Sequence, residues 1–305
     1  MAVSPGVTTV IPTHNRPELM TVALRSVLEQ EYDGPVEVVV VFDACTPFRP
    51  DVEVPAHCTL RTTENKRSRG LAGARNTGID LASHDFVAFL DDDDAWLPGK
   101  LAAQMEVFAD RPSTVLVGTA MLVDDGVRTH ERLTPTDLAR HQDLLRDRMA
   151  GLHSSTFVFR TDALRGEIGM VDEALPGSYG EDYDLLLRTA KVAPVAVVNR
   201  PLVRVSWQGQ SFFFGKWQQY ADGLTYLLEQ HPEFETERRS AGRIKSQIAF
   251  ARASSGRRRE AIGWALRALR NDPTQVKAYL ALGIAARLLS SPWVVRTVQR
   301  FGRGI

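Results

Sequence analysis

Short apolar runs alternate with amphipathic segments through the first half of the chain. Residues 7–13 and 36–42 have the composition of strands, and the second contains four consecutive valines, as is typical of strands covered on both faces. Residues 17–29 and 71–82 have apolar positions at helical spacing, and Pro17 suits the first turn of a helix. This alternation predicts an α/β fold in which crossover helices connect a mostly parallel sheet.

The same patterns extend through the rest of the chain. They predict further strands at 59–63, 86–90, 114–123, 156–160 and 195–198, and further helices at 98–109 and 183–191. Residues 124–151 are polar and charged, and we expect a mobile segment there, near the active face. Beyond Phe212 the pattern is helical, and residues 247–283 resemble part of a tetratricopeptide-like hairpin. About one and a half such units cannot build a solenoid, so a helical cap on the body is the favoured interpretation.

Charge divides the chain near residue 237. The 305 residues carry 37 Lys and Arg against 37 Asp and Glu. From Arg238 onward there are 15 basic and two acidic residues, so this part carries +13 and the first 237 residues carry −13. We therefore predict a body at 1–236 and a basic helical extension at 237–305. The extension suits contact with anionic lipid, nucleic acid or the acidic body, and composition does not choose among them.

Cysteine usage and the N-terminus bear on the compartment. Cys45 and Cys58 are too few for a disulfide scaffold and lack metal-ligand spacing, which fits a reducing compartment. The N-terminus has no basic start followed by an apolar stretch, and no apolar run reaches the roughly 18 residues of a membrane span. These features predict a cytoplasmic protein.

Four consecutive acids, Asp91 to Asp94, follow the predicted strand at 86–90. Adjacent carboxylates repel one another, so they must be solvated, protonated or neutralised by a cation. A solvated turn is the simpler explanation, but the carboxyl end of a buried strand is where open α/β sheets bind ligands. We therefore favour cation binding, with Mg²⁺ or Mn²⁺ as the hard cation. An EF-hand is disfavoured because Trp96 stands where its loop needs glycine.

Glu181 and Asp182 form a second acidic site before the predicted helix at 183–191. Acids in a first helical turn interact favourably with the helix dipole, and this alone would explain them. Beside a metal-binding acidic run they also become candidates for a general base. The sequence has neither a G-x-G-x-x-G loop after its first strand nor a P-loop, so nicotinamide and P-loop chemistries lose their best support.

Five motifs occur in order within residues 5–210. They are Val10-Ile11-Pro12-Thr13-His14-Asn15-Arg16, Val41-Phe42-Asp43, Gly73-Ala74-Arg75-Asn76-Thr77-Gly78, Phe89-Leu90-Asp91-Asp92-Asp93-Asp94-Ala95-Trp96-Leu97-Pro98-Gly99-Lys100-Leu101 and Gly180-Glu181-Asp182. In this order and at these separations they resemble the motifs of family-2 glycosyltransferases with the GT-A fold. The resemblance implies a Rossmann-like mixed sheet flanked by helices, and it leaves the helical extension unexplained.

The resemblance also implies a reaction. Such an enzyme moves a hexose from a nucleoside-diphosphate donor, here UDP or dTDP first, to an acceptor hydroxyl with inversion at the anomeric carbon. The acceptor would be a glycan, a lipid-linked sugar or a small molecule. Negative charge builds on the leaving diphosphate, and a bound Mg²⁺ or Mn²⁺ would stabilise it. The anomeric carbon then has oxocarbenium character.

Roles for single residues follow from the same resemblance. The residues expected along the nucleotide are Pro12, Thr13, Asn15, Arg16, Asp43 and Arg69, with Lys66 behind Arg69. The first metal ligand is Asp93 and the second is Asp91, while Asp91 or Asp92 would hold ribose or donor sugar. Asp182 matches the general base, and Glu181 would orient acceptor or metal.

Some positions depart from the family pattern or leave alternatives open. Ala44 stands where a second acid often follows Asp43, and Gln208 stands where many relatives carry a metal-binding histidine. His153 is a candidate acceptor or phosphate contact, although an ordinary loop histidine is the simpler explanation. Trp96 is expected to be structural, and three phenylalanines at 212–214 suggest a flap or a docking surface.

Two other functions compete with transfer. A sugar-phosphate nucleotidyltransferase would need a glycine-rich loop after the first strand, and residues 12–17 contain no glycine. A non-catalytic interaction protein would dock partners through the helical extension, but both acidic sites are present. We expect no nucleic-acid partner. Residues 293–301 have the composition of an interfacial helix, so peripheral contact with the inner face of the membrane stands beside packing against the acidic body.

Overall fold

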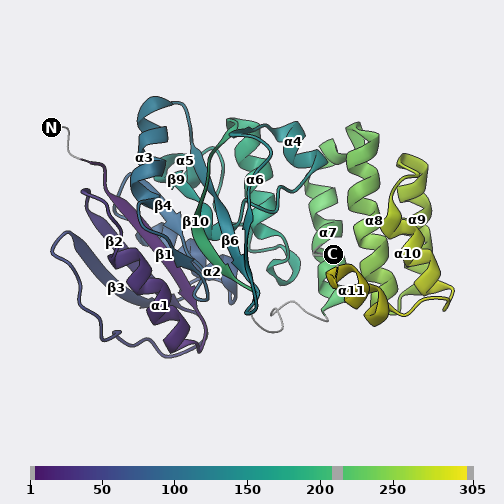
Figure 1. Cartoon of the computed structure of the whole chain (residues 1–305), viewed down its shortest axis with the longest axis horizontal. Helices are drawn as coiled ribbons and strands as arrows, with labels where there is room; N and C mark the ends of the chain where they lie inside the picture. The colour runs from purple at the N-terminus through teal and green to yellow at the C-terminus, as the bar shows by residue number, and fades with distance from the viewer. Residues whose placement is uncertain (1–3, 208–215, 301–305) are drawn as a thin grey trace. The chain divides into compact units, whose positions relative to one another are not determined.

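The computed structural model describes residues 4–207 and 216–300, except for the side chains of 297–300. The chain divides into two compact units (Figure 1). The sheet unit comprises Met1–Leu144, Arg148–Glu173 and Glu181–Ser211, and the helical unit comprises Leu145–Asp147, Ala174–Gly180 and Phe212–Ile305. The expectations for Gln208 and for the phenylalanines at 212–214 lie outside the described residues.

The strands of the sheet unit form one mixed sheet. Within the described residues they are β1 Val7–Thr13, β2 Val36–Phe42, β3 Cys58–Glu64, β4 Phe86–Phe89, β5 Ala95–Trp96, β6 Leu116–Asp124, β7 Thr129–Arg132, β8 Leu138–Ala139, β9 Val158–Arg160 and β10 Val195–Ser206. Their order is β3-β2-β1-β4-β9-β6-β10-β5, with β7 paired to β6 and β8 to β10. The neighbours from β3 to β4 run parallel, as the sequence pattern predicts.

β9 interrupts the parallel order. It pairs antiparallel with both β4 and β6, and β5, β7 and β8 are also antiparallel to their partners. A parallel connection needs a crossover of a dozen or more residues that returns the chain to the same edge, usually as a helix. Between β6 and β9 the chain instead forms β7, β8 and the short helix α4 (His141–Arg146). The predicted parallel pairing is therefore confirmed from β3 to β4 and again between β6 and β10, whereas β9 runs antiparallel between these two groups; the mixed GT-A sheet is confirmed.

Helices cover both faces of the sheet. They are α1 Pro17–Leu28, α2 Leu71–Leu81, α3 Lys100–Asp110, α5 Thr161–Arg165 and α6 Glu181–Val192. α1 and α3 share one core with Ile11 of β1, whereas α2 packs on the opposite face, where Val10 points because side chains alternate along a strand. The approach is close: a Cβ added at Gly78 of α2 would lie 2.2 Å from Val10 Cγ1.

Several predicted boundaries move. The helix expected at 98–109 begins at Lys100, and the strand expected at 156–160 begins at Val158, after a 3-10 turn at Ser154–Thr156. The strand expected at 195–198 continues to Ser206 through register shifts at Pro201. The polar segment 124–151 contains β7, β8 and α4.

The helical unit contains α7 Trp217–Gln230, α8 Arg238–Ser254, α9 Arg258–Asn271, α10 Val276–Ala285 and α11 Ser291–Arg300, so the helical pattern beyond Phe212 is confirmed. Its core is built from small side chains, including Ala261, Ala265 and Ala281, which let the helices approach closely. Val294 and Val295 of α11 are buried in that core. In the described part of the chain, every helix falls short of the length and apolarity needed to cross a membrane.

Candidate active site

The acidic run lies at the carboxyl edge of the parallel strands. β4 leads through Leu90 into Asp91, β1 ends at Thr13, and β2 is followed by Asp43. These three strands are parallel neighbours, so their carboxyl ends meet at one edge. Open α/β sheets bind ligands at such an edge.

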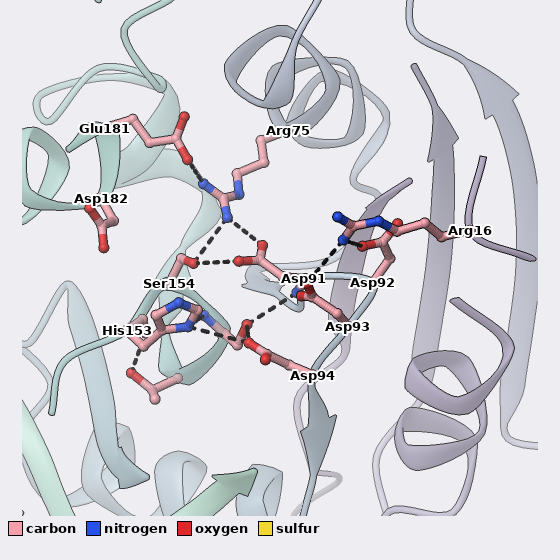
Figure 2. A network of polar contacts seen from close by, with 12 residues as sticks. Arg16, Arg75, Asp91, Asp92, Asp93, Asp94, His153, Ser154, Glu181 and Asp182 are labelled. Atoms are coloured by element: carbon pink, nitrogen blue, oxygen red, sulfur yellow. Dashed lines mark hydrogen bonds and ion pairs between the residues drawn. The ribbon is translucent and has the colours of Figure 1, made fainter. Parts of the chain in front are cut away.

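Arg75 of α2 joins the two acidic motifs. Its Nη1 donates to Glu181 Oε1, and its Nη2 donates to Asp91 Oδ1 and, at 2.9 Å, to Ser154 Oγ. Figure 2 shows the guanidinium between Glu181 and Asp91. Only 1% of Arg75 is exposed; burial lowers its pKa, but the two carboxylates raise it further, so the group stays charged. A buried guanidinium is tolerated only when paired in this way, and the pairing fixes α2, the acidic run and α6 together.

Glu181 keeps one carboxylate oxygen without a partner. Oε1 accepts from Arg75, whereas the buried Oε2 accepts no hydrogen bond within the described part of the chain. Burial raises the pKa of Glu181 to about 7, with Asp182 and Asp91 adding to the shift and Arg75 opposing it. At neutral pH the carboxyl is therefore divided between its protonated and ionised forms, as suits a group that exchanges protons.

Arg16 and Thr13 hold the middle of the acidic run. Arg16 Nη1 donates to Asp92 Oδ1 at 3.2 Å and to Asp93 Oδ2 at 2.9 Å. Thr13 Oγ1 donates to Asp92 Oδ2 at 2.8 Å. Burial raises the pKa of both aspartates, and the negative charge of Asp91 adds to the shift. Two residues expected along the nucleotide thus contact the acidic run directly.

Asp94 lies deeper than its neighbours. Ser155 Oγ donates to its Oδ2 at 2.5 Å and the Ser206 backbone N–H donates to its Oδ1 at 3.2 Å. Burial raises the pKa of Asp94 well above its ordinary value. His153 Nδ1 lies 3.4 Å from Oδ2, and burial lowers the pKa of this imidazole, which favours its neutral, metal-binding form.

One cluster within the described residues has the geometry for a metal ion. Ligand atoms of Asp91, Asp94 and His153 all lie within 4.8 Å of one another. Two carboxylates and a neutral imidazole suit Mn²⁺ and related divalent ions. Burial and the negative charges of Asp91 and Asp93 oppose ionisation of Asp94, which a bound cation would favour. Asp93, the first expected ligand, is instead paired with Arg16 and keeps 40% of its side chain exposed.

Asp182, the expected base, begins α6 beside Glu181. Arg148 Nη2 donates to its Oδ2, and 13% of its side chain is exposed. Burial raises the pKa of Asp182, but Arg148 and then His153 lower it further, so the net shift is downward. The carboxylate is therefore ionised at neutral pH and able to accept a proton.

Asp43 orders the loop that precedes α2. Its Oδ1 accepts from Asn65 Nδ2 at 2.7 Å, and its Oδ2 accepts from the Gly70 backbone N–H at 3.0 Å. Arg69, next to Gly70, is exposed on the same loop. Asn15 adopts a φ of 53° beyond the end of β1, and Pro12 is buried within that strand.

Comparison with known proteins identifies the family. The sequence profile of glycosyl transferase family 2 matches residues 8–166, which is more than half of the chain. The chain belongs to this family. The match contains the acidic run, Arg75 and His153, and it ends before Glu181 and Asp182.

Relatives named as glycosyltransferases are similar over part of their length. The pre-mycofactocin glycosyltransferase of Mycobacterium tuberculosis is 32% identical over 198 residues, 59% of this chain and 41% of that protein. The chain thus spans about two fifths of that relative. The UDP-Glc:alpha-D-GlcNAc-diphosphoundecaprenol beta-1,3-glucosyltransferase WfgD of Escherichia coli is 25% identical, over 63% of this chain and 73% of WfgD.

Two solved structures of other proteins share the GT-A fold of this chain. TarS of Staphylococcus aureus superposes with a TM-score of 0.58 at 16% identity, covering 92% of this chain and 53% of TarS. The mannosyltransferase PcManGT of Pyrobaculum calidifontis, solved with GDP-Man and Mn²⁺, superposes with a TM-score of 0.57 at 21% identity. This superposition covers 98% of this chain and 87% of PcManGT. At these identities the likeness concerns the fold.

Sequence reasoning alone did not place three of the residues that shape the site. Arg148 comes from the polar segment 124–151, which carries no motif. Ser154 and Ser155 carry no distinctive spacing, yet one bonds Arg75 and Asp91 and the other bonds Asp94. The only sequence signal was their place in front of a strand that enters the sheet beside β4. Trp96, by contrast, is buried as expected and donates to the Ser155 carbonyl at 2.9 Å.

Proposed function

We propose that the chain is an inverting glycosyltransferase that moves a sugar from a nucleoside-diphosphate donor to an acceptor hydroxyl. The observation that carries this is the Arg75 bridge, which holds Asp91 of the acidic run and Glu181, the neighbour of Asp182, on one guanidinium. A donor-side acid and an acceptor-side acid are thereby kept in one site. Membership of the family supports the reaction class.

In the proposed transfer the acceptor hydroxyl oxygen attacks the anomeric carbon from the face opposite the diphosphate. The bond between the anomeric carbon and the diphosphate oxygen breaks, and its electron pair leaves with the diphosphate. Asp182, ionised and at the start of α6, takes the hydroxyl proton. Glu181 lies beside it with one unpartnered oxygen that can orient the acceptor.

On the donor side, Asp43 and the loop it orders would face the nucleotide, together with Arg69 and the backbone around Pro12 and Asn15. Thr13 and Arg16 would also face the nucleotide. Arg16 pairs with the acidic run through Nη1, and the Thr13 hydroxyl donates to Asp92 but can still accept a hydrogen bond. UDP or dTDP remains the first donor to test.

We propose a divalent cation, Mg²⁺ or Mn²⁺, held by Asp91, Asp94 and His153. Bound there, it would neutralise charge developing on the leaving diphosphate. Asp91 is shared with Arg75 and Asp94 with Ser155, so these partners orient the carboxylates that would hold it. Asp93, whose Oδ2 pairs with Arg16 at 2.9 Å, stays an alternative ligand.

The acceptor is proposed to be a glycan, a lipid-linked sugar or a small molecule. WfgD is named for a diphosphoundecaprenol-linked acceptor and the mycobacterial relative for pre-mycofactocin, which supports the second and third classes. Nucleic acid is not proposed as a partner.

Thermal unfolding with UDP, dTDP, GDP and CDP, each with and without Mn²⁺, tests the donor and the metal together. A ligand at about 100 times its dissociation constant stabilises by about 2.7 kcal/mol. We expect one nucleotide to stabilise the wild type only with Mn²⁺. His153→Ala should abolish that gain if His153 is a ligand, and Asp93→Ala should abolish it if Asp93 is. Glu106→Gln, an exposed acid on α3, is the control, and no shift with any nucleotide would contradict the proposal.

The released product separates transfer from nucleotidyl transfer. Glycosyl transfer releases nucleoside diphosphate, whereas a sugar-phosphate nucleotidyltransferase transfers a nucleoside monophosphate unit from a nucleoside triphosphate and releases pyrophosphate. We expect the diphosphate, because the loop after β1 lacks the glycines of the competing class.

For peripheral membrane contact we propose α9 in place of α11. Val294 and Val295 of α11 are buried, so they cannot enter a bilayer. On α9, Ile262 and Leu266 are 41% and 58% exposed on a helix that also carries exposed arginines at 258, 259, 267 and 270, a combination suited to an anionic surface. Ile262→Ser with Leu266→Ser should abolish co-sedimentation with anionic vesicles, and binding equal to wild type would reject this face.

A further inference from the structure

Arg132, at the end of β7, is partly buried and stacks on an aromatic ring. Its guanidinium carbon lies 4.2 Å from the centre of the Trp207 ring, and Trp207 follows β10 directly. Among the residues that the structure describes, no Asp or Glu forms an ion pair with Arg132, although its side chain is partly buried. A guanidinium stacked on an indole still presents its N–H edges for hydrogen bonds.

Arg132 is linked to the proposed base through Arg148. Burial lowers its pKa, and the charge of Arg148 lowers it further, so the two guanidinium groups interact. Arg148 pairs with Asp182. The chain after Arg148 also runs against β7, because a Cβ added at Gly151 would lie 3.0 Å from the Arg132 carbonyl oxygen.

Two neighbouring guanidinium groups repel each other, and one of them has no carboxylate to offset its burial. An oxyanion that both could contact would relieve this, and the planar guanidinium fork matches a phosphate or a carboxylate. The bound oxyanion would also draw Arg148 away from Asp182. Because Arg148 lowers the pKa of Asp182, its withdrawal would make that carboxylate a stronger proton acceptor.

We propose that Arg132, stacked on Trp207 and beside Arg148, binds an oxyanion of the acceptor, either a phosphate ester or a carboxylate. The site would then select acceptors that carry a negative group near the attacking hydroxyl. This inference rests on the proposed function, because it takes Asp182 as the base and the neighbouring space as the acceptor site.

The test titrates the full chain with phenyl phosphate, benzoate and benzyl alcohol by ligand-observed NMR, with and without saturating UDP and Mg²⁺. We expect the dissociation constant of the preferred anion to rise about tenfold in Arg132→Gln. It should rise several-fold in Arg132→Lys, because lysine keeps the positive charge but lacks the two parallel N–H donors of the guanidinium. Arg128→Gln, which removes an exposed arginine of the same hairpin, should change it less than about twofold. Benzyl alcohol should show no dependence on Arg132.

The two anions distinguish the sources. Tighter binding of phenyl phosphate indicates a phosphate-bearing acceptor, and tighter binding of benzoate indicates an acidic sugar or another carboxylic acid. Equal binding by wild type and both Arg132 variants would overturn the inference. Displacement of the anion by UDP with Mg²⁺ would also overturn it, because the oxyanion site would then belong to the donor. Failure of every nucleotide to bind wild type would instead remove the proposed function, and the nucleotide-free titration would still report on Arg132.

Discussion

The buried carboxyl of Glu181 makes the stability of the sheet unit depend on pH. Burial raises its pKa from 4.5 to about 7. A carboxyl with a raised pKa binds its proton more tightly in the folded protein than in the unfolded chain. Its contribution to the free energy of unfolding is therefore fully present below about pH 4.5 and is lost as the pH rises through about 7. The whole shift corresponds to about 3 kcal/mol, most of which falls between about pH 5 and pH 8.

Glu181→Gln isolates this contribution. The amide has nearly the same shape, its carbonyl oxygen can still accept from Arg75, and it does not titrate. Urea unfolding of wild type and variant at several pH values gives a difference in which groups common to both proteins cancel. We expect the wild type to lose about 2 to 3 kcal/mol relative to Glu181→Gln between about pH 5 and pH 8, with Glu106→Gln parallel to wild type. Parallel profiles for wild type and Glu181→Gln would refute the reasoning.

Three further predictions concern the base, its partner and the packing of α2. Asp182→Asn should lower kcat by roughly 100- to 10,000-fold without weakening nucleotide binding measured by calorimetry, and an equal loss of nucleotide affinity would contradict its role as base. Arg148→Gln removes the main charge that lowers the pKa of Asp182, so the acid limb of the kcat profile should move to higher pH, whereas Arg128→Gln should leave it in place. Gly78→Ala should destabilise the fold by about 1 to 3 kcal/mol, because its Cβ would lie 2.2 Å from Val10 Cγ1. Gly263→Ala in α9 should instead stabilise the fold by about 0.5 to 1 kcal/mol, because nothing lies within 4 Å of the added Cβ. If urea unfolding gave both variants effects of the same sign, this account of glycine packing would be wrong.

The strongest local patterns predicted the fold well. β1, β2 and α2 appear where apolar periodicity placed them, because each is buried along a whole strand or helical face. β9 shows where such reasoning ends. Its three residues are recognisable as a strand, but their direction depends on the path of the preceding 30 or so residues, which no local period encodes.

The candidate site shows the same division between residue position and side-chain partner. Sequence order correctly placed Arg16 after β1 and Asp91 after β4, since parallel strands bring those ends together. It did not reveal that Arg16 turns toward Asp92 and Asp93. The position of a residue in a loop determines where its Cα lies, whereas the neighbouring charges determine which conformation a long side chain adopts and which groups it contacts. Arg75 makes the point more strongly, because its two carboxylates lie 16 and 106 residues away in the chain.

Charge neutralisation across the site explains which groups are left for chemistry. Arg16 pairs with both Asp92 and Asp93, and Arg75 pairs with both Asp91 and Glu181. Within the described residues, the partners of Asp94 are His153, whose lowered pKa favours the neutral imidazole, the Ser155 hydroxyl and the Ser206 backbone N–H. Burial is the main cause of the raised pKa values of Asp94 and Glu181, and the negative charge of Asp91 adds to both shifts. A cation bound beside Asp94 would favour its ionised form, and the same cation would offset the charge that develops on the leaving diphosphate in the proposed transfer.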